Sequence, residues 1–396
     1  MTSHTPPGDA FDMPGLWPTA DQLLLLKAGL LGKDEACEAM QLWLDEADRS
    51  NGLDGASVRL LSLAYSNLQQ FCFQAPLMNR LAATHRASRL KAASLFHDAE
   101  KLAAALSDAG IPVMVLKGLH LAQEYYPDPA ARPMNDLDLA VPKAHAEAAN
   151  RVLEGLGYSR DFADEAFEKC VRYQHALPYV SDKGADLDLH FRVLLLRDDP
   201  TCDDVFWQQS VPFRLGNTPV VAMNPTHLLF HTVVHGICWN PMPPLRWIAD
   251  AMMVLRKSGN EIDWNEIGDL AVSRQVTHRA RLGLQYLNAS FHAPVPEGLI
   301  ERLKTCPESL VERVENACII YNTEQDDVLG IYRRWFGEHT RRFSGRNPVR
   351  FLYEFADYLR FRTEQVHTFA GLVCFVALGV FKYVGRKAGF PAERAS

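Results

Sequence analysis

The sequence predicts an α+β fold, in which a mixed β-sheet with its own helices is flanked by helical regions on the N-terminal and C-terminal sides. Short apolar runs of strand length lie in the middle of the chain, over residues 110–222. Over residues 20–109 and 223–396, apolar residues recur at helical spacing instead. Strands alternating with helices between two helical tracts indicate a central α+β core of one domain with added helical regions.

The N-terminal part is expected to begin with a loose tail over residues 1–19. This stretch contains Pro and Gly and lacks a basic start followed by an apolar run, so it does not resemble a signal peptide. In the helical region 20–109, Asn51-Gly52 and Asp54-Gly55 interrupt the helical pattern. Helices are expected after this break, at 60–68 and 87–109.

The central core, residues 110–222, contains apolar and β-branched runs separated by Gly and Pro. The expected strands cover 111–116, 137–141, 176–180 and 186–194, and the expected helices cover 119–126 and 143–156. In the C-terminal region 223–396, helices are expected at 227–238, 245–258, 264–271 and 278–291.

An uncharged apolar stretch at 369–381 is followed by Lys382, Arg386 and Lys387. It is shorter than the roughly 20 residues that a membrane span requires. Three interpretations remain open: a buried C-terminal helix, a helix that makes weak contact with a membrane surface or a partner, or a true membrane span.

The composition excludes several classes of function. The formal net charge is −7, which does not suit non-specific coating of nucleic acid, because that affinity comes from many Lys and Arg contacts with phosphate. The 8 cysteines are scattered without a C-x-x-C pair. Their spacing argues against a zinc ribbon or a disulfide framework and is consistent with a cytoplasmic protein.

The segment that carries most chemical information surrounds Asp136 and Asp138. Side chains alternate along a strand, so both carboxylates project to one side, while Leu137, Leu139 and Val141 take the other. Adjacent carboxylates repel unless a cation lies between them, and Mg²⁺ prefers carboxylate oxygens together with substrate phosphates.

A third acid is expected from a neighbouring strand, with Asp186 and Asp188 as candidates on the same face as His190 and Arg192. Three acids on adjacent strands suit two-metal phosphoryl chemistry. The alternative is that these acids form only the polar face of an exposed strand.

With these residues in view, the chain resembles the nucleotidyltransferase fold superfamily that includes DNA polymerase β. It is most similar to the bacterial family labelled uncharacterised nucleotidyltransferase, and more distantly to the toxin-type nucleotidyltransferases of abortive-infection systems. The resemblance covers roughly residues 60–295. The matching segments are Val115–Gly118, Tyr125–Arg132, Asn135–Leu139, Asp188–Arg192, Leu245–Asp250 and Ile262–Trp264.

The resemblance implies Mg²⁺- or Mn²⁺-dependent transfer of a nucleotide from an NTP, such as ATP, with release of pyrophosphate. Asp136 and Asp138 would ligate the metal. Asp188 would complete the site and help to deprotonate the acceptor hydroxyl. Asp188 is preferred to Asp186 because the family's acid lies two positions before His190. His190 would orient Asp188 or contact the acceptor or nucleotide, or would be an ordinary polar residue of the strand.

Phosphate binding is assigned to Gly118 by the same resemblance, at a strand-to-helix turn whose N–H groups meet phosphate. The sequence departs from the superfamily pattern in two places. Leu119 occupies the place of the usual small hydroxylated residue, and the gap from Gly118 to Asp136 is longer than in the polymerase-like members. Lys117 and Arg132 are therefore the expected additional phosphate ligands. The alternatives are a solvated turn lysine and a structural ion pair of Arg132 with the acids.

Other polar groups are ambiguous in the sequence. His227, His231 and His235 share a helix face and are expected to pack against the sheet, with substrate contact or zinc binding as alternatives. Trp247 and Asp250, one helical turn apart, are expected to pack and cap. A basic cluster would bind RNA or anionic lipid, or would form a solvated face paired with acids. It comprises Arg333, Arg334, Arg341, Arg342, Arg346 and Arg350.

The acceptor is left open by the sequence. A small molecule, sugar or peptide would suit a biosynthetic enzyme, and an RNA or protein would suit a toxin-type or regulatory enzyme. The remaining interpretation is a non-catalytic scaffold that keeps the fold.

Overall fold

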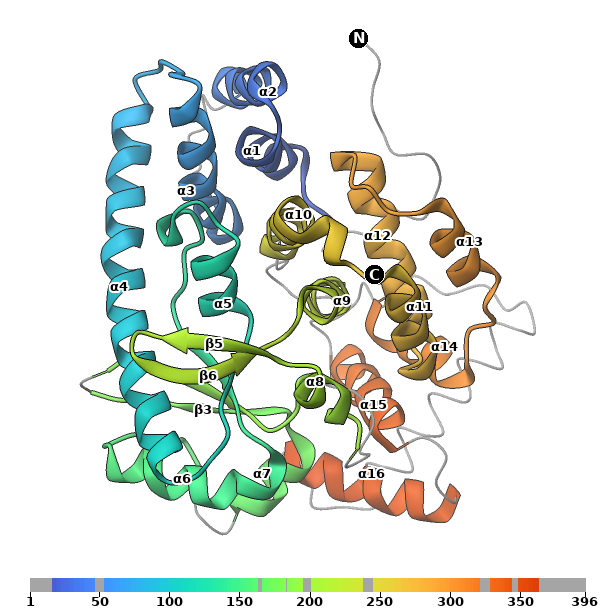
Figure 1. Cartoon of the computed structure of the whole chain (residues 1–396). Coiled ribbons are helices and arrows are strands. Elements are labelled where there is room, and N and C mark those ends of the chain that lie inside the picture. Colours follow the sequence, from blue (N-terminus) through green and yellow to red (C-terminus); the bar gives the residue numbers. More distant parts are fainter. Residues whose placement is uncertain are drawn as a thin grey trace. The chain divides into compact units, whose positions relative to one another are not determined.

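The computed structural model describes residues 16–46, 53–162, 166–182, 184–194, 201–237, 245–320, 328–343 and 348–362. The chain divides into two compact units, Met1–Glu312 and Arg313–Ser396. Figure 1 labels the elements of both units, and each unit is described by itself.

Within the described residues of the first unit, six strands form one mixed sheet in the order β3-β4-β2-β1-β6-β5. β2 runs parallel to β4, and β1 runs parallel to β6, whereas the other three neighbouring pairs are antiparallel. This sheet with its surrounding helices confirms the predicted α+β fold. The strands are β1 (Met114–Val115), β2 (Leu137–Ala140), β3 (Ala176–Tyr179), β4 (Leu187–His190), β5 (Val211–Leu215) and β6 (Thr218–Ala222).

The two central strands β2 and β4 follow the alternation expected from their sequences. Leu137, Leu139 and Leu189 are completely buried, while the acids between them are half-buried on the other face. Burial of a leucine side chain contributes about 1.5–3 kcal/mol, so this alternation fixes which face of each strand is polar.

The hairpin β5–β6 was not predicted from the sequence. Pro212 and Pro219 interrupt its two runs, and proline weakens a strand signal although it is compatible with an edge strand such as β5. Its turn contains Gly216 at φ +56°, where an added Cβ would lie 2.3 Å from the Glu100 carboxylate. Two predicted strands were too long, because only 114–115 of 111–116 and 187–190 of 186–194 pair in the sheet.

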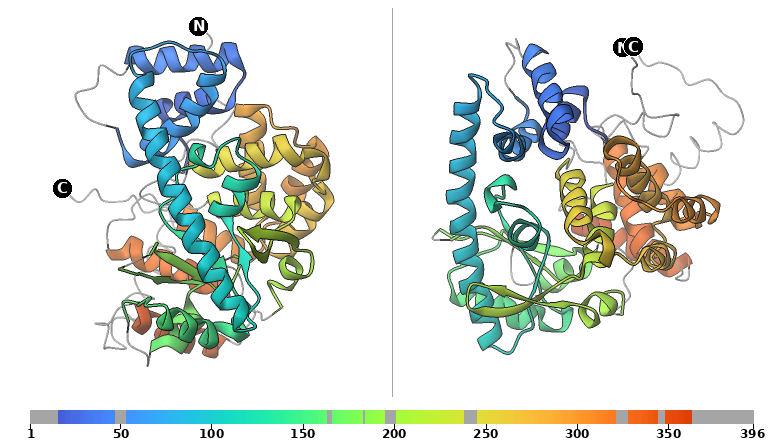
Figure 2. Two further views of the ribbon diagram at one scale, coloured as in Figure 1. Left: turned by 60° about the vertical axis from the view of Figure 1, so that its left-hand side comes forward. Right: turned by 45° about the horizontal axis from the view of Figure 1, so that its top comes forward.

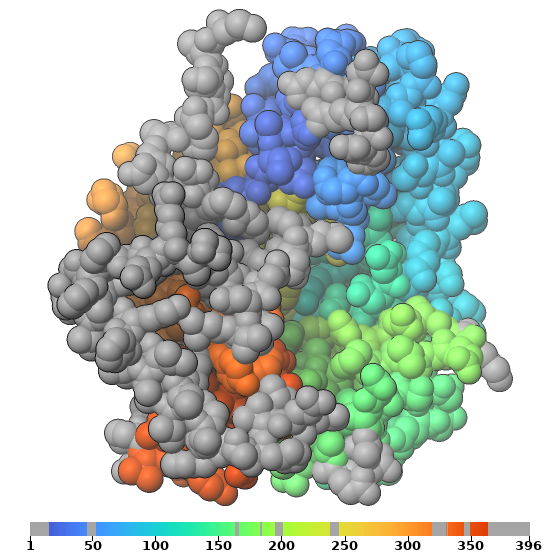
Figure 3. Space-filling model, turned by 180° about the vertical axis from the view of Figure 1, so that it is seen from behind, coloured from blue at the N-terminus to red at the C-terminus, as the bar shows by residue number. Residues whose placement is uncertain are grey.

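The N-terminal helices pack beside the sheet, and the longest of them, α4, replaces the shorter helix expected at 87–109. α4 runs across the sheet (Figure 2, left), where Asp98 accepts a hydrogen bond from the Ala185 amide at 3.1 Å and Glu100 accepts one from the Asn217 amide at 2.7 Å. In Figure 3 the blue surface of the first helices adjoins the cyan surface of α4. These helices are α1 (Ala20–Leu30), α2 (Lys33–Glu46), α3 (Gly55–Gln70) and α4 (Met78–Asp108).

The packed region begins before residue 20, where the loose tail was expected to end. Leu16 and Trp17 are buried, and the Trp17 ring stacks on Tyr286 with centroids 4.5 Å apart. Thr19 caps α1 through a reciprocal capping box with Gln22, which satisfies N–H groups that would otherwise lack partners. Residues 1–15 lie outside the described residues.

Helices complete the first unit around the sheet. Figure 1 shows α5 between α4 and the pair α9–α10. Gly236 allows α9 and α10 to approach closely, since a Cβ at this position would lie 2.1 Å from Cγ of Trp247. The helices are α5 (Lys117–Glu124), α6 (Ala146–Gly155), α7 (Phe167–Tyr173), α8 (Asp204–Gln208), α9 (Pro225–Gly236), α10 (Arg246–Ser258), α11 (Trp264–Ser273), α12 (Thr277–Phe291) and α13 (Glu297–Thr305). The boundary between the two units falls within α14 (Leu310–Glu315).

The second unit contains the π-helix η6 (Asn316–Ile320), α15 (Val328–Phe343) and α16 (Pro348–Arg362). It holds most of the basic cluster expected from the sequence. Arg341 is buried in an ion pair with Glu315, Arg350 pairs with Glu354 at 3.1 Å, and the Arg342 guanidinium lies over the Tyr358 ring.

Two expectations about the C-terminal region fall outside what the structure describes. Arg346 and the apolar stretch 369–381 are not among the described residues. In the ranges that are described, every helix is too short or too polar to traverse a lipid bilayer.

Candidate functional site

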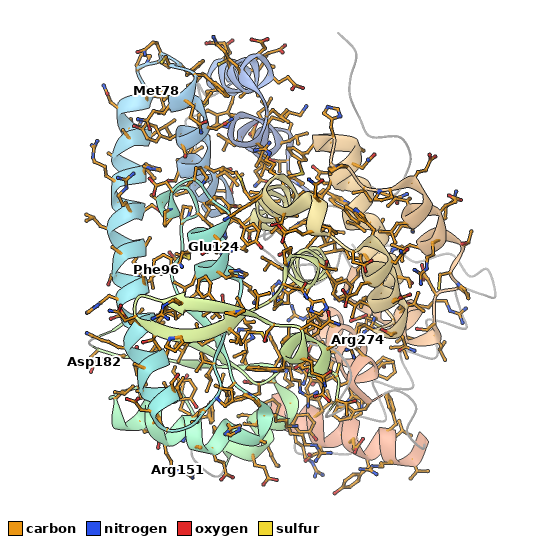
Figure 4. All side chains as sticks on the ribbon, in the orientation of Figure 1. Met78, Phe96, Glu124, Arg151, Asp182 and Arg274 are labelled. Atoms are coloured by element: carbon orange, nitrogen blue, oxygen red, sulfur yellow. The ribbon has the colours of Figure 1, made fainter. Side chains whose placement is uncertain are left out.

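A cleft with an empty volume of about 790 Å³, partly open to solvent, lies at the N-terminal end of α5. Glu124, labelled in Figure 4, marks the other end of this helix. The cleft is bounded by β2, β4, α5, α9 and α10, and by the segment that leads into β2. Its charged lining comprises Lys117, Arg132, Asp136, Asp138, Asp188, Arg246 and Asp250.

Three of the acids predicted from the sequence line this cleft together. Asp138 on β2 lies directly beside Asp188 on the parallel strand β4, as Cα partners in the register. Asp136, just before β2, is exposed. Asp186 is also exposed and is not among the lining residues, so the geometry favours Asp188 over Asp186 as the third acid.

Asp138 is held by two basic groups on one of its oxygens. Nε2 of His190 donates to Oδ1 at 2.9 Å, and Nζ of Lys117 lies 3.5 Å from the same atom. Burial raises the pKa of Asp138, but Lys117 and the His190 hydrogen bond outweigh it and hold that pKa well below its usual range. Asp138 is therefore a carboxylate whose Oδ2 makes no hydrogen bond within the described residues.

Asp188 has the opposite electrostatic character. Burial raises its pKa, and the negative charges of Asp138 and Asp136 raise it further. Among the residues that the structure describes, none donates a hydrogen bond to its carboxyl group. One strongly acidic and one weakly acidic carboxyl group thus lie side by side, an arrangement often found where a site handles protons or cations.

This donor set suits a hard cation, because three of the four carboxyl groups that line the cleft share one lysine, while the fourth, that of Asp250, is paired with Arg132. The three carboxyl groups do not converge on a single point, since the described ranges contain no three acidic, histidine or cysteine side chains grouped closely enough to hold a metal ion. Asp136 is exposed and makes no hydrogen bond within those ranges, so no hydrogen bond holds its carboxylate in its present position.

Arg132 is fixed on another wall of the cleft by a buried carboxylate. Its Nε and Nη2 donate to Oδ1 and Oδ2 of Asp250, both at 2.8 Å, and the Tyr126 hydroxyl donates to Oδ1 at 2.8 Å. The alternative expected for Arg132, a structural ion pair, is therefore present, with Asp250 as the partner. Nη1 remains without a partner in the described part of the chain and points toward Gly118.

The start of α5 places two predicted residues in the cleft. Lys117 adopts φ +37°, which is unusual for a residue other than glycine. No side chain caps this end of α5, so its first N–H groups lack helical partners. A larger residue than Gly118 would fit tightly here, because a Cβ would lie 3.1 Å from Sδ of Met134 and 3.2 Å from Nη1 of Arg132.

Arg246, at the start of α10, lines the cleft but was not singled out as a site residue in the sequence. Its Nη1 donates to the Pro133 carbonyl at 2.5 Å. Burial lowers its pKa to about 10, and the charge of Arg132 contributes. Two signals were available in the sequence: Arg246 lies within the family-like segment Leu245–Asp250, and it lies one helical turn before Asp250. Neither revealed the cleft, because Asp250 pairs with a residue 118 positions away.

The histidine stripe of α9 divides between two environments. His227 is buried and bonds to Glu266 at 3.0 Å. His231 and His235 line the cleft with ring centroids 5.5 Å apart. Burial lowers the pKa of His231 to about 3. The ammonium of Lys117 holds the pKa of His235 below its usual range. His231 is thus a neutral group packed beside the acids.

Two other predicted residues have roles different from those expected. His190 is buried and is absent from the cleft lining, and its hydrogen bond goes to Asp138 rather than to Asp188. Asp250 was expected to pack or cap, but it anchors Arg132. Trp247 packs as expected, against Tyr286 and Trp17.

A sequence model of the family described as "Uncharacterised nucleotidyltransferase" matches residues 56–292 of the chain. The matched span runs from α3 to α12 and includes every residue that lines the cleft. Comparisons with curated proteins and with solved structures gave no match.

Proposed function

The chain belongs to the uncharacterised nucleotidyltransferase family, and from this premise we propose that its cleft transfers a nucleoside monophosphate from an NTP to an acceptor hydroxyl, with Mg²⁺ or Mn²⁺ as cofactor. One observation carries the proposal. Asp136, Asp138 and Asp188 share a cleft with a fixed arginine and an uncapped helix N-terminus. Carboxylates suit the metal, and N–H and guanidinium groups suit the phosphates.

The acids fit a divalent cation because their oxygens are largely uncommitted and their charges repel one another. Asp136, Asp138 and Asp188 would hold the ion. When bound, it would supply charge neutralisation and Lewis-acid polarisation of the phosphates and of the attacking oxygen.

Side chains of the cleft would accept the proton, position the acids and bind the phosphates. The acceptor oxygen forms a bond to the α-phosphorus, the bond to the pyrophosphate oxygen breaks, and the hydroxyl proton goes to the carboxylate of Asp188. His190 holds Asp138 in place. Lys117, the Gly118 N–H and Nη1 of Arg132 would bind and orient the phosphates, which lowers the entropic cost of reaching the transition state.

The acceptor is proposed to be a small molecule or a singly docked group, and not a long nucleic acid. The basic cluster offered the main argument for RNA. Arg341, however, is committed to Glu315, and Arg350 is committed to Glu354. The formal net charge of −7 also disfavours extended phosphate contacts.

The test uses NTPs labelled at the α-phosphate or at the γ-phosphate, with the full chain, Mg²⁺ and fractionated cell extract as the acceptor source. We expect α-label, but not γ-label, to enter a product. Asp188→Asn should lower transfer by roughly 10²–10⁴-fold, while the matched variant Asp186→Asn, next to the same strand but outside the cleft, should keep it. Equal activity of the two variants, or transfer of γ-label, would refute the proposal.

Nucleotide binding gives a second readout that needs no acceptor. An NTP at 100 times its dissociation constant stabilises the folded state by about 2.7 kcal/mol. The temperature of thermal unfolding should therefore rise with one or more NTPs in the presence of Mg²⁺, and the rise should be lost in Asp136→Asn/Asp138→Asn. A rise of equal size in that double variant would show that nucleotide binds elsewhere.

A further inference from the structure

Three arginines from different elements act together at this cleft. Arg132, on the segment before β2, and Arg246, at the start of α10, line it. Burial lowers the pKa of Arg246, and the positive charges of Arg132 and of Arg59 on α3, which is not among the lining residues, lower it further, whereas Asp250 and Asp136 raise it. Gathering like charges in a partly buried site is unfavourable unless an anion compensates them.

Within the described residues, the protein supplies an acidic partner to only one of the three. Asp250 takes two nitrogens of Arg132. Arg246 has a single hydrogen bond, from Nη1 to the carbonyl of Pro133, and Arg59 has none. Nε and Nη2 of Arg246 are neither bonded nor fully buried in this part of the chain, and the residue lines the cleft.

The neighbouring groups complete an environment for an anion. Nη1 of Arg132 lies near Gly118, at the uncapped start of α5, where N–H groups and the helix dipole favour negative charge. The hydrogen bond to Pro133 holds the Arg246 side chain in the cleft without neutralising it. A guanidinium held in this way keeps two donors in the planar geometry that matches phosphate oxygens.

We propose that Arg246, supported by Arg132 and Arg59, binds the terminal phosphates of the nucleotide, which makes this wall of the cleft a polyphosphate site that is separate from the carboxylate wall. The identity of the anion rests on the proposed nucleotidyl transfer, whereas the site itself rests on the arginines. Inorganic polyphosphate shares the relevant chemistry and should bind to the same wall without a nucleoside.

The probe is inorganic tripolyphosphate, titrated calorimetrically into the full chain with EDTA and, separately, with Mg²⁺. We expect binding to the wild type without metal, and a loss of about tenfold to hundredfold in affinity for Arg246→Ala, as for a lost charge-assisted pair. Arg246→Lys should keep part of the affinity. The matched control is Arg256→Ala, which removes the same charge from an exposed position on α10 outside the cleft lining.

Circular dichroism and unfolding without ligand verify folding of each variant, and Arg246→Gln replaces Arg246→Ala if the smaller side chain disturbs α10. The inference is overturned if tripolyphosphate does not bind to the wild type, or if Arg246 variants bind it as well as Arg256→Ala does. Its failure is distinct from that of the proposed function. If tripolyphosphate binding depends on Arg246 but no label is transferred, only the proposed nucleotidyl transfer is refuted. If label is transferred and Arg246→Ala leaves the KM for the NTP unchanged, only the proposed polyphosphate site is refuted.

Discussion

Substitution of Asp250 by asparagine should destabilise the first unit strongly, because it removes the charge that balances a buried arginine. Asp250 and Arg132 are 7% and 6% exposed at their side chains, and two 2.8 Å contacts join them. Tyr126 donates a third hydrogen bond to the same carboxylate. Asparagine has nearly the same shape, so the change creates no cavity and isolates the loss of charge.

Breaking a buried ion pair by removing one partner costs about 3–5 kcal/mol, because the other charge stays buried without compensation. In a unit of this size, 1 kcal/mol corresponds to about 2 °C in Tm, so Asp250→Asn should lower Tm by about 6–10 °C. Urea unfolding followed by circular dichroism measures the same loss. The double variant Arg132→Met/Asp250→Leu should recover most of it, because a well-packed apolar pair replaces the buried charges.

The matched control is Asp269→Asn, which removes the carboxylate of an exposed ion pair. Arg302 and Asp269 are 41% and 72% exposed at their side chains, and such pairs contribute about 0–1 kcal/mol. Asp269→Asn should therefore leave Tm nearly unchanged. The reasoning fails if Asp250→Asn costs no more than Asp269→Asn, or if the double variant is as unstable as Asp250→Asn.

Two further predictions concern pH and packing. His231 has a pKa of about 3 in the folded state and 6.5 in the unfolded state, so its contribution to stability is complete above pH 6.5 and is lost as the pH falls toward 3. Between pH 6 and 4, His231→Gln should reduce the slope of the free energy of unfolding against pH, measured with urea, by up to about 1.4 kcal/mol per pH unit. Equal slopes for the wild type and the variant would contradict this. Gly236→Ala should destabilise by at least about 1–3 kcal/mol in the same assay, because its Cβ would lie 2.1 Å from Trp247. Gly155→Ala, a helical position with nothing within 4 Å, should be neutral or stabilising by about 0.5–1 kcal/mol, so equal losses would contradict the packing argument.

The fold class and the grouping of the acids were accessible from the sequence because both depend on local periodicity. A period of two puts Asp136 and Asp138 on one face and Asp188 on the corresponding face of its strand. The structure then brings Asp138 beside Asp188 through the β2–β4 register. The hairpin β5–β6 was missed for an equally local reason, since Pro212 and Pro219 obscure its strand pattern.

The partners of the basic residues could not be predicted, because they depend on packing between distant segments. Arg132 meets Asp250 across 118 residues, and Arg246 reaches the cleft only because α10 packs beside the segment that carries Pro133. His190 contacts Asp138 rather than Asp188 because it lies on the neighbouring strand, diagonally from Asp138. Without the strand order, the sequence suggested Asp188, on the same strand, as the acid that His190 would orient.

Lys117 combines an unusual backbone conformation with a positive charge in the cleft. Its φ of +37° costs an L-residue roughly 1–2 kcal/mol, and glycine would remove that cost. Glycine, however, would also remove the single ammonium that reaches Asp138. That charge lowers the pKa of Asp138 and also lowers the pKa of His235, an exposed histidine that lines the same cleft. Electrostatics therefore explains why a lysine adopts a left-handed conformation at this turn. Glycine would adopt it without strain, but glycine has no side chain that could place a positive charge between the acids and the start of α5.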